Sequence, residues 1–457
     1  MLMNLRLRAG LAASCLLAFV AACSSSEPAQ PSAGDVRELL PETGSTSSAI
    51  TYWQHVRPVL EEKCATCHVA GGIAPFTLDT YAAAKMRAGA IADATGARVM
   101  PPWPPGPLSP KMMHDRSLSD AQIALLGSWV AGGAAEGDAT AAAPLAAAEV
   151  VRLPTVDVKR DIGVDYTPPS GVTDDYRCFL VELGTTEDRV SLGYRVTPGN
   201  PKTVHHVITS LFDGASLDAL RALDAESPDR AGWPCSGGPV PQSAEASIKP
   251  VGALGSWVPG VSTVLFPAGT GTLVPKGSVT VMQIHYNIHE APAPDRTTIE
   301  VALAPKGKEP ALRLATLPIR NRTMQIPPGA KDVAVETTST ARQLAQGRFY
   351  PDGKATLHMV AGHMHMVGVH FSLTLQRATG EKEVLLDIPA WNFHWQGSYA
   401  LATPKTVGPD DVVTVRCVYD NTPAHLSAVG YPEAPRMVTN GEGSTDEMCI
   451  GYLTITD

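Results

Sequence analysis

SVTVMQIHYNI, the run at residues 278–288, decides the fold of the longer part of this chain. Successive side chains of a β-strand point to opposite faces of its sheet. In this run the apolar Met282 and Ile284 fall on one face, whereas Gln283 and His285 fall on the other. The alternation predicts a strand whose apolar face packs on a core and whose polar face is left for other contacts.

Short alternating runs of the same kind continue beyond residue 160, among them FLVELG, TVHHVITSLF, GVHFSLTLQR and VVTVRCVYDN, with Gly and Pro at short intervals. This texture predicts an all-β region of sandwich type. Its roughly three hundred residues exceed one ordinary β-sandwich. We therefore expect two in tandem, at residues 162–305 and 306–457, with the break near PKGKEPALR.

The preceding residues 50–138 have a helical texture instead. YWQHVRPVLEEKC at residues 52–64 and DAQIALLGSWVAGG at residues 120–133 place apolar side chains at helical spacing. We expect a small all-α domain here, followed by a linker at residues 139–161. The Ala-rich stretch DATAAAPLAAAEVVRLP at residues 138–154 overlaps this linker and fits either an extended linker or a short helix.

The string CATCH at residues 64–68 has the pattern of a c-type haem attachment site. Cys64 and Cys67 would bind the porphyrin covalently, and His68 would be an axial ligand of the iron. A zinc or redox CxxC motif would not need His68. For the other axial ligand we expect Met100, which stands just before a Pro-rich loop. The competing ligands are Met86, Met112, Met113 and His114.

The N-terminus has the pattern of an export signal. Residues 1–8 carry two arginines, and the apolar run at 9–22 ends at Cys23 in a motif that looks like a bacterial lipobox. We expect a lipoprotein signal peptide at residues 1–23, lipidation of Cys23, and a flexible tether at residues 24–49. The alternative is a plain secretory signal. The serine that follows the cysteine indicates an outer-membrane lipoprotein facing the periplasm or the cell surface.

Composition excludes some classes of partner. The chain has 457 residues, an apolar fraction of 44% and a formal net charge of -9. No cluster of Lys or Arg indicates a nucleic-acid surface, so no nucleic-acid partner is expected. No run after the signal is long and apolar enough to cross a bilayer, so we expect attachment to the membrane by the lipid alone.

The eight cysteines fall into three groups. Cys15 and Cys23 belong to the export segment, and two more belong to the CATCH motif. An exported chain meets an oxidising compartment, so disulfides are expected among the rest. These four are Cys178, Cys235, Cys417 and Cys449.

Histidines with metal-ligand spacing occur at three places in the β region. In GHMH at residues 362–365, His363 and His365 are two apart and would share one face of a strand, where both could chelate one ion. The alternative is a pair of solvent-facing histidines. His285 lies beside Gln283 on the polar face of its strand, where a hydrogen-bonded histidine is equally in keeping with the pattern.

The adjacent His205 and His206 present a different problem. Neighbours in a regular strand point to opposite faces, so both could reach one metal only at a bulge or twist. Spacing alone leaves this pair open.

Five motifs, TVHHVITSLF, QIHYN, GHMHMVG, CVYDN and STDEMCIGY, resemble in content and order those of the copper type II ascorbate-dependent monooxygenases. This family includes peptidylglycine α-hydroxylating monooxygenase and dopamine β-monooxygenase, and the resemblance spans most of residues 162–457. It implies two jelly-roll-type β-sandwiches, each with one copper ion. The implied ligands are His205, His206 and His285 for the first copper, and His363, His365 and Met448 for the second.

The resemblance also implies a division of labour. The copper with the methionine ligand would bind O2 and direct hydroxylation of a substrate C–H bond, and the other would supply the second electron. Imidazole suits copper in both oxidation states, and a thioether favours Cu(I). Met448, His363 and His365 are therefore expected catalytic residues, and Gln283, which has no obvious partner in the sequence, is a further candidate.

Cys417 and Cys449 match the family's disulfide beside the methionine ligand. Cys178 resembles a family cysteine whose partner is missing here, which leaves the pairing of Cys178 with Cys235 open.

Two departures concern the substrate. Peptide-amidating members of the family have an Arg and an Asn that help grip the peptide carboxylate, where this chain has Ala361 and Ile450. Tyr452 matches the family's nearby tyrosine. Without the arginine a carboxylate loses its bidentate partner, so peptide amidation is not expected. The remaining histidines, expected to be structural or surface residues, include His55, His289, His358, His370, His394 and His425.

The sequence thus predicts a two-copper monooxygenase, an oxidoreductase that hydroxylates a small organic substrate with O2. A haem c domain would supply or relay electrons, replacing or assisting ascorbate or another donor. The alternative is a surface lipoprotein that transfers electrons or handles copper and haem without hydroxylating anything. A zinc hydrolase would need a Glu base near the HxH motif, which the sequence lacks.

Overall fold

The computed structural model describes residues 49–70, 74–145, 151–227, 230–241, 243–244, 247–261, 263–288, 291–345 and 354–456. The expected signal peptide with Cys15 and Cys23, nearly all of the tether, and His289 lie outside these residues. Residues 49–457 make up one compact unit. Among the described residues, none of the helices combines the length and apolar character needed to span a membrane.

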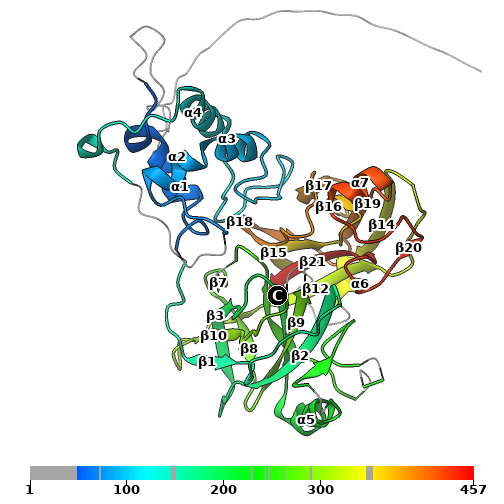
Figure 1. The fold of residues 1–457 in the computed structure, drawn as a ribbon. Coiled ribbons are helices and arrows are strands. Elements are labelled where there is room, and N and C mark those ends of the chain that lie inside the picture. Colours follow the sequence, from blue (N-terminus) through cyan, green and yellow to red (C-terminus); the bar gives the residue numbers. More distant parts are fainter. Residues whose placement is uncertain are drawn as a thin grey trace, which may run out of the picture. The chain divides into compact units, whose positions relative to one another are not determined.

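Short helices form the first part of this unit (Figure 1). They are a π-helical turn at Tyr52–Val56, α1 (Arg57–Lys63), α2 (Tyr81–Met86), α3 (Ala88–Gly96) and α4 (Asp120–Ala131). The helix α4 starts with a capping box, in which Ser119 and Gln122 each accept a hydrogen bond from the other's backbone N–H. Trp129 and Leu126 of α4 are fully buried in a small core with Tyr52.

The predicted fold class, an all-α cytochrome c-like domain ahead of two jelly-roll-type β-sandwiches, is wrong. Strands make up 36% of the structure and helices 17%, so it is mostly β, and the helices belong to the same compact unit as the strands. The segment after α3 pairs with a sheet: Met112 forms a β-bridge with Leu401, and the Gly106 N–H donates to the carbonyl of Asp387. Met112 is also buried in the C-terminal core. Helical periodicity gave no sign of these contacts, because it reports only local structure.

Two sheets enclose the N-terminal β core, which includes Met282 and Ile284. The first contains β1 (Val158–Asp161), β10 (Thr298–Leu303), β3 (Arg189–Thr197), β8 (Thr270–Val274) and β11 (Leu312–Arg313), with β7 (Thr263–Leu265) paired to β3. The second has the order β5 (Trp233–Pro234), β2 (Asp174–Glu182), β9 (Val279–Asn287), β4 (Val204–Phe212) and β6 (Gly252–Trp257). A smaller core contains the disulfide Cys178–Cys235 and Leu220 of α5 (Leu217–Ala225).

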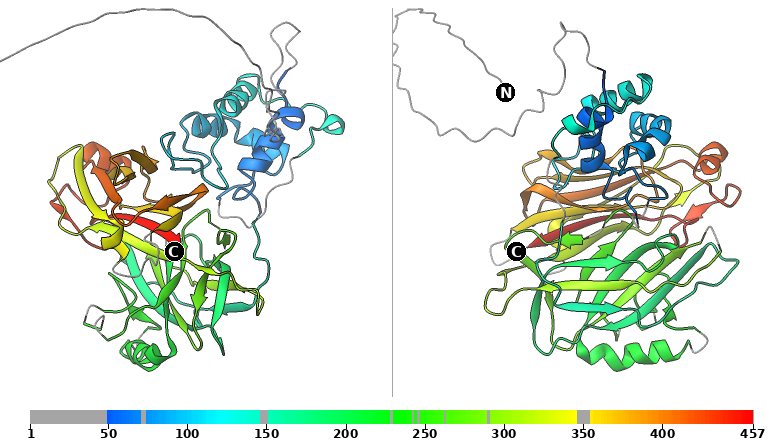
Figure 2. Two further views of the ribbon diagram at one scale, coloured as in Figure 1. Left: turned by 180° about the vertical axis from the view of Figure 1, so that it is seen from behind. Right: turned by 60° about the vertical axis from the view of Figure 1, so that its left-hand side comes forward.

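Two further sheets enclose the C-terminal β core (Figure 2). One has the order β12 (Ala315–Asn321), β21 (Cys449–Thr456), β15 (Ala355–His363) and β18 (Ser398–Val407). The other has the order β14 (Val333–Thr340), β19 (Val412–Tyr419), β16 (Gly368–Gln376) and β17 (Lys382–Ile388). A two-stranded sheet joins β13 (Gln325–Ile326) to β20 (Val438–Thr439), and α6 (Ala341–Ala345) and α7 (Pro423–Ala428) are short.

The strand β9 is buried along its whole length. Met282, Ile284 and Tyr286 pack in the N-terminal core, as their alternation predicts. The opposite face, with Gln283 and His285, is also shielded from solvent. Buried polar side chains need partners, so this face of β9 is where a site is to be sought.

Candidate metal centre

A bulge in β4 brings His205 and His206 together. Val204 pairs with Tyr286 and His206 with His285, so the register between β4 and β9 shifts at this point and leaves His205 as the extra residue. The Nδ1 atoms of the two imidazoles are 3.3 Å apart. Two nitrogens bound to one ion at about 2.0–2.1 Å with a tetrahedral angle would be about 3.3 Å apart.

His285 completes a cluster of three histidines, defined here as the first cluster. Its ring centroid lies 5.1 Å from that of His205 and 4.8 Å from that of His206. One ligand nitrogen from each ring can be chosen so that all three lie within 4.8 Å of one another. A geometry of this kind could hold one metal ion.

The tautomer of His285 follows from its neighbour Asp174. The Nε2–H of His285 donates to Oδ1 of Asp174 over 2.8 Å, which leaves Nδ1 with its lone pair. This Nδ1 is buried and has no hydrogen-bond partner among the described residues. An acidic residue that fixes the far nitrogen of a histidine is a common arrangement behind metal ligands. The ring of Tyr176 stacks on His285 at a centroid distance of 4.1 Å.

His363 and His365 form the second cluster, at the end of β15 and just beyond it. His363 Nδ1 donates to Oε1 of Gln396 over 2.5 Å, and His365 Nδ1 donates to the carbonyl of Asp446 over 3.2 Å. Both Nε2 atoms are then without a proton, and they face each other at 3.2 Å. Two lone pairs at this distance repel unless a cation lies between them.

All five imidazoles are held neutral. Burial lowers the pKa of His363 to about 4, and it lowers the pKa of His285 although Asp174 acts in the opposite direction. Burial and the neighbouring histidines lower the pKa of His205, His206 and His365 well below the usual value. The neutral imidazole is the form that binds metal.

Met448 is buried, and its backbone shares a hydrogen-bond acceptor with the backbone of His365 in the second cluster. Its backbone N–H and that of His365 both donate to Oε2 of Glu447. Oε1 of Glu447 accepts from the N–H groups of Val367 and Gly368. Burial raises the pKa of Glu447 to about 8, against the effect of these four donors.

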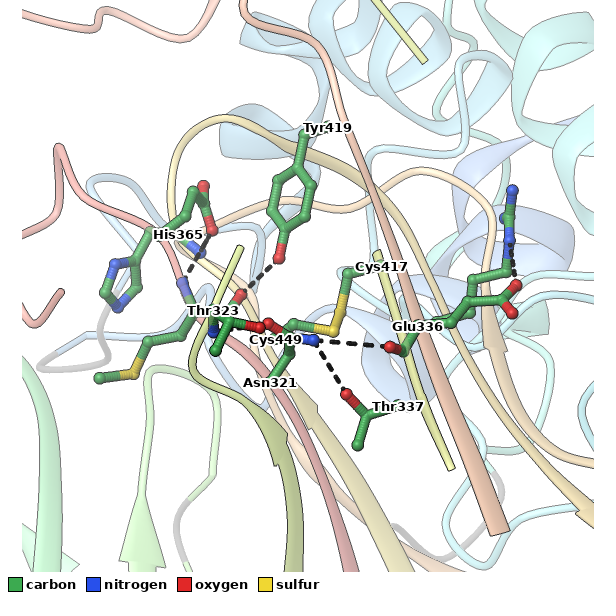
Figure 3. The surroundings of a disulfide bond; sticks show 11 residues. Asn321, Thr323, Glu336, Thr337, His365, Cys417, Tyr419 and Cys449 are labelled. Atoms are coloured by element: carbon green, nitrogen blue, oxygen red, sulfur yellow. Dashed lines mark hydrogen bonds and ion pairs between the residues drawn. A yellow bond between two sulfur atoms is a disulfide. The ribbon is translucent and has the colours of Figure 1, made fainter. Parts of the chain in front are cut away.

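The disulfide Cys417–Cys449 fixes the residue after Met448 to β19 (Figure 3). Tyr419, two residues after Cys417, donates its hydroxyl hydrogen to the carbonyl of Met448 over 2.8 Å. The expected disulfide Cys417–Cys449 is present, and Cys178 pairs with Cys235, a pairing that the sequence leaves open.

The two clusters are close to each other. The ring centroids of His206 and His363 are 6.3 Å apart. Phe393 stacks on His205 with a centroid distance of 4.2 Å. Its ring is nearly perpendicular to that of His365, at a centroid distance of 5.9 Å. Both clusters therefore share one aromatic neighbour.

Gln283 is not unpartnered, contrary to its reading from the sequence. Its Nε2 donates to the carbonyl of Cys235 over 2.6 Å, so it ties β9 to the disulfide. Sequence reasoning missed Asp174, Phe393 and Gln396, because nothing in their local patterns links them to the histidines. Glu447 lies inside the STDEMCIGY motif, but its role depends on hydrogen bonds with the backbone of residues 365–368, which are distant in sequence.

Most of the remaining described histidines have partners away from both clusters. His358 pairs with Thr456, His370 with Asp387, His425 with the carbonyl of Met366 and His55 with Thr51. His394 is the exception, since its ring lies 5.7 Å from that of His205.

The CATCH motif follows α1. Cys64 and Cys67 form no disulfide, and burial raises the pKa of Cys64 to about 12. His68 Nδ1 donates to the carbonyl of Phe76 over 3.0 Å, which leaves Nε2 with its lone pair, and its ring packs on Phe76. Met100 is half-buried after α3.

The solved structures to which this chain is similar include three distant ones. PNGF-II matches with 10% identity and a TM-score of 0.26, and the alignment covers 65% of this chain and 65% of that one. A structure of infectious bursal disease virus, Gt strain, matches with 10% identity and a TM-score of 0.18, over 67% and 73% of the two chains. The PBSX exported protein XepA matches with 8% identity and a TM-score of 0.15, over 63% and 88%.

No match was found among curated proteins. Residues 314–455 match the family model described as copper type II ascorbate-dependent monooxygenase, C-terminal domain. The match contains the second cluster, Met448 and the disulfide Cys417–Cys449, and it does not extend to the CATCH motif or the first cluster. The family is one of copper-dependent oxidoreductases that use ascorbate. The match to residues 314–455 thus supports the relation of this chain to the copper type II ascorbate-dependent monooxygenases.

Proposed function

We propose that this protein is a two-copper monooxygenase that hydroxylates a C–H bond of a small organic substrate with O2. The observation that carries the proposal is the pair of unprotonated Nε2 atoms of His363 and His365, 3.2 Å apart within the family match. When bound there, copper would supply the activation of O2 and the electrons that hydroxylation consumes.

The first copper site in this proposal consists of His205, His206 and His285. The fit is supported by the 3.3 Å spacing of the first two Nδ1 atoms and by the buried, unpartnered Nδ1 of His285. Asp174 holds the ring of His285 in the tautomer that presents this nitrogen. Three imidazoles and no thioether suit an ion that changes oxidation state.

The second copper site consists of His363, His365 and Met448. Oε1 of Gln396 and the carbonyl of Asp446 accept hydrogen bonds from the Nδ1–H groups of the two histidines and so keep their Nε2 atoms available. The thioether of Met448 would favour Cu(I). Support for this ligand comes from its place in the family match and from the side chain of Glu447, which holds the backbone at both His365 and Met448.

The substrate in this proposal is a small molecule without a carboxylate to be gripped. Ala361 pairs with Tyr452 and His363 pairs with Ile450 across β15 and β21, so short or apolar side chains lie beside the second site. A bidentate partner for a carboxylate is absent at these two positions.

We further propose that a haem held by Cys64, Cys67 and His68 would supply electrons to the copper sites, with Met100 as the other axial ligand. The segment that contains Met100 contacts the sheet that carries His363. Trp103, three residues after Met100, packs edge-on against Tyr399 of β18 at a centroid distance of 5.5 Å, and Tyr399 pairs with Val360 of β15, three residues before His363. In the same proposal, lipidation of Cys23 anchors the protein in the cell envelope.

Copper and haem content of the purified chain, followed by O2 uptake with ascorbate and a panel of neutral organic compounds, would test the proposal. We expect two copper ions and one haem per chain, and substrate-dependent uptake that Met448→Ala abolishes. Met437→Ala is the matched control, because Met437 is an exposed methionine outside both clusters. Copper binding without uptake by any compound would favour the alternative, an electron-transfer or metal-handling protein. Absence of copper would overturn the proposal.

A further inference from the structure

Asp174, the first residue of β2, uses both of its carboxylate oxygens. Oδ1 accepts from Nε2 of His285 over 2.8 Å and from Nδ2 of Asn287 over 2.9 Å. Oδ2 accepts from the hydroxyl of Ser444 over 2.6 Å. One carboxylate therefore connects a histidine of the first cluster to the C-terminal part of the chain.

Ser444 lies four residues before Met448, in segment 440–447, which together with Met448 joins β20 to β21. Its side chain is fully buried, so its hydroxyl depends on protein partners. This segment also supplies the carbonyl of Asp446 to His365 and the carboxyl group of Glu447 to the backbone of Met448. Its position thus bears on the second cluster.

Tyr176 makes a second connection from the same strand. Its ring stacks on His285 at 4.1 Å with an interplanar angle of 8°, and its hydroxyl donates to the carbonyl of Glu442 over 2.7 Å. Asp174 and Tyr176 are two residues apart on β2, so their side chains share one face. Each of them contacts both His285 and segment 440–447.

We infer that Asp174 is a positioning residue that couples the two metal sites through Ser444. This inference rests on the proposed function and extends it. A metal bound by His285 fixes the ring, and the ring fixes the carboxylate that holds Ser444. Segment 440–447 is then held in the geometry that the second site requires. By linkage, metal at the second site strengthens the first by the same factor.

The test measures Cu(I) affinity of the second site with a competing chelator, with and without a working first site. His285→Ala disables the first site, and the ratio of second-site affinities between the parent and His285→Ala is the coupling factor. Cu–S scattering in X-ray absorption assigns the copper to the site of Met448. We expect a coupling factor of about 5 or more in the wild-type chain.

The coupling factor is then measured in the same way in chains that carry Ser444→Ala or Asp174→Asn. Ser444→Ala should reduce it toward 1 while leaving the affinity of the first site, measured with the second site disabled by His363→Ala, within about twofold, since Ser444 touches no histidine of that site. Asp174→Asn should also remove the coupling and weaken the first site by about 10–100-fold, as loss of a group behind a metal ligand does. Ser372→Ala on β16 is the control and should leave the ratio unchanged.

A coupling factor of about 1 in the wild-type chain, or one that persists in both Ser444→Ala and Asp174→Asn, would overturn the inference. Each of these two results can be obtained while both sites bind copper, in which case the inference fails but the proposed function stands. Failure of the wild-type chain to bind copper at either site overturns the proposed function and the coupling together. Thermal melting of each variant separates loss of coupling from loss of folding.

Discussion

The backbone N–H groups of His365 and Met448 donate to the same atom, Oε2 of Glu447, at N···O distances of 2.9 and 3.1 Å. These two residues are 83 positions apart in sequence and come together through one buried side chain. Because Oε1 of Glu447 accepts hydrogen bonds from two more backbone N–H groups, a single carboxyl group holds both chain segments at the second cluster.

Glu447→Gln should therefore weaken the second site. The side chain of Glu447 accepts hydrogen bonds through two oxygens, whereas that of Gln accepts through one, so at least one buried N–H loses its acceptor, at a cost of about 1–3 kcal/mol in unfolding free energy. Denaturant unfolding measures this loss, and copper titration should find lower affinity at the second site with the first unchanged.

Glu309→Gln is the control for this variant, because Glu309 is exposed and its change should alter stability by less than about 0.5 kcal/mol. Equal effects of the two substitutions would contradict the role given to Glu447.

Removal of the disulfide Cys417–Cys449 should have both a general and a local effect. The bridge spans 32 residues, and loss of a loop of this length destabilises a protein by about 3–4 kcal/mol in the chain-entropy model. Cys449 adjoins Met448, so the double Ser variant should also lose affinity at the second site.

The matched comparison is the double Ser variant of Cys178–Cys235, which spans 57 residues and lies in the N-terminal part. It should cost a similar amount in unfolding free energy while leaving the second site's copper affinity within about twofold. If both variants reduced that affinity equally, the local effect would be refuted.

The candidate site was predictable where a short motif carried the information. The alternation in β9 correctly placed Met282 and Ile284 in the core, and the need for a bulge at His205 and His206 followed from strand geometry. What the alternation could not reveal is that the polar face of β9 is also buried, because burial depends on strands distant in sequence.

Contacts between residues that are distant in sequence could not be predicted from the sequence. Asp174 is 111 residues from His285 in sequence, and no local pattern joins them. The same limit explains the wrong fold class, since the pairing of Met112 with Leu401 integrates the helical segment with a sheet. Gln283 is a catalytic candidate from the sequence because a hydrogen bond to a backbone carbonyl cannot be recognised in the sequence.

Gly362→Ala should damage the second cluster by steric conflict. A Cβ at this position would lie 2.6–2.8 Å from three ring carbons of the buried Phe371, which cannot move without repacking the core. Overpacking of this kind costs about 1–3 kcal/mol. The adjacent His363 should shift, so calorimetry should find a lower melting temperature and copper titration a weaker second site.

Gly89→Ala supplies the opposite case on helix α3, where an added Cβ meets nothing within 4 Å. Alanine favours helix over glycine by up to about 1 kcal/mol, so this variant should be as stable as the parent or more so. Destabilisation by both substitutions alike would argue against the steric account.

Glu300 should make stability depend on pH through two cross-strand partners. It lies on β10 between Lys159 of β1 and Arg195 of β3, directly opposite both. Burial raises the pKa of Glu300, but hydrogen bonds from Lys159 and Arg195 outweigh it, and the net pKa is lowered. A carboxyl whose folded-state pKa is lowered stabilises the protein above its unfolded pKa of about 4.3, and this contribution disappears as pH falls through the folded-state value.

Glu300→Gln should therefore lower the unfolding free energy by about 1–3 kcal/mol at pH 7, and the difference from wild type should shrink as the pH is lowered below about 4.3. Chemical denaturation between pH 3 and pH 7 measures the gap. Glu187→Gln is the control, because Glu187 is 44% exposed and its ion pair with Lys306 is screened by solvent, so its effect should stay below about 1 kcal/mol at every pH. A gap for Glu300→Gln that is the same at pH 3 and pH 7 would mean that the substitution acts through packing, because only the ionised carboxylate attracts Lys159 and Arg195.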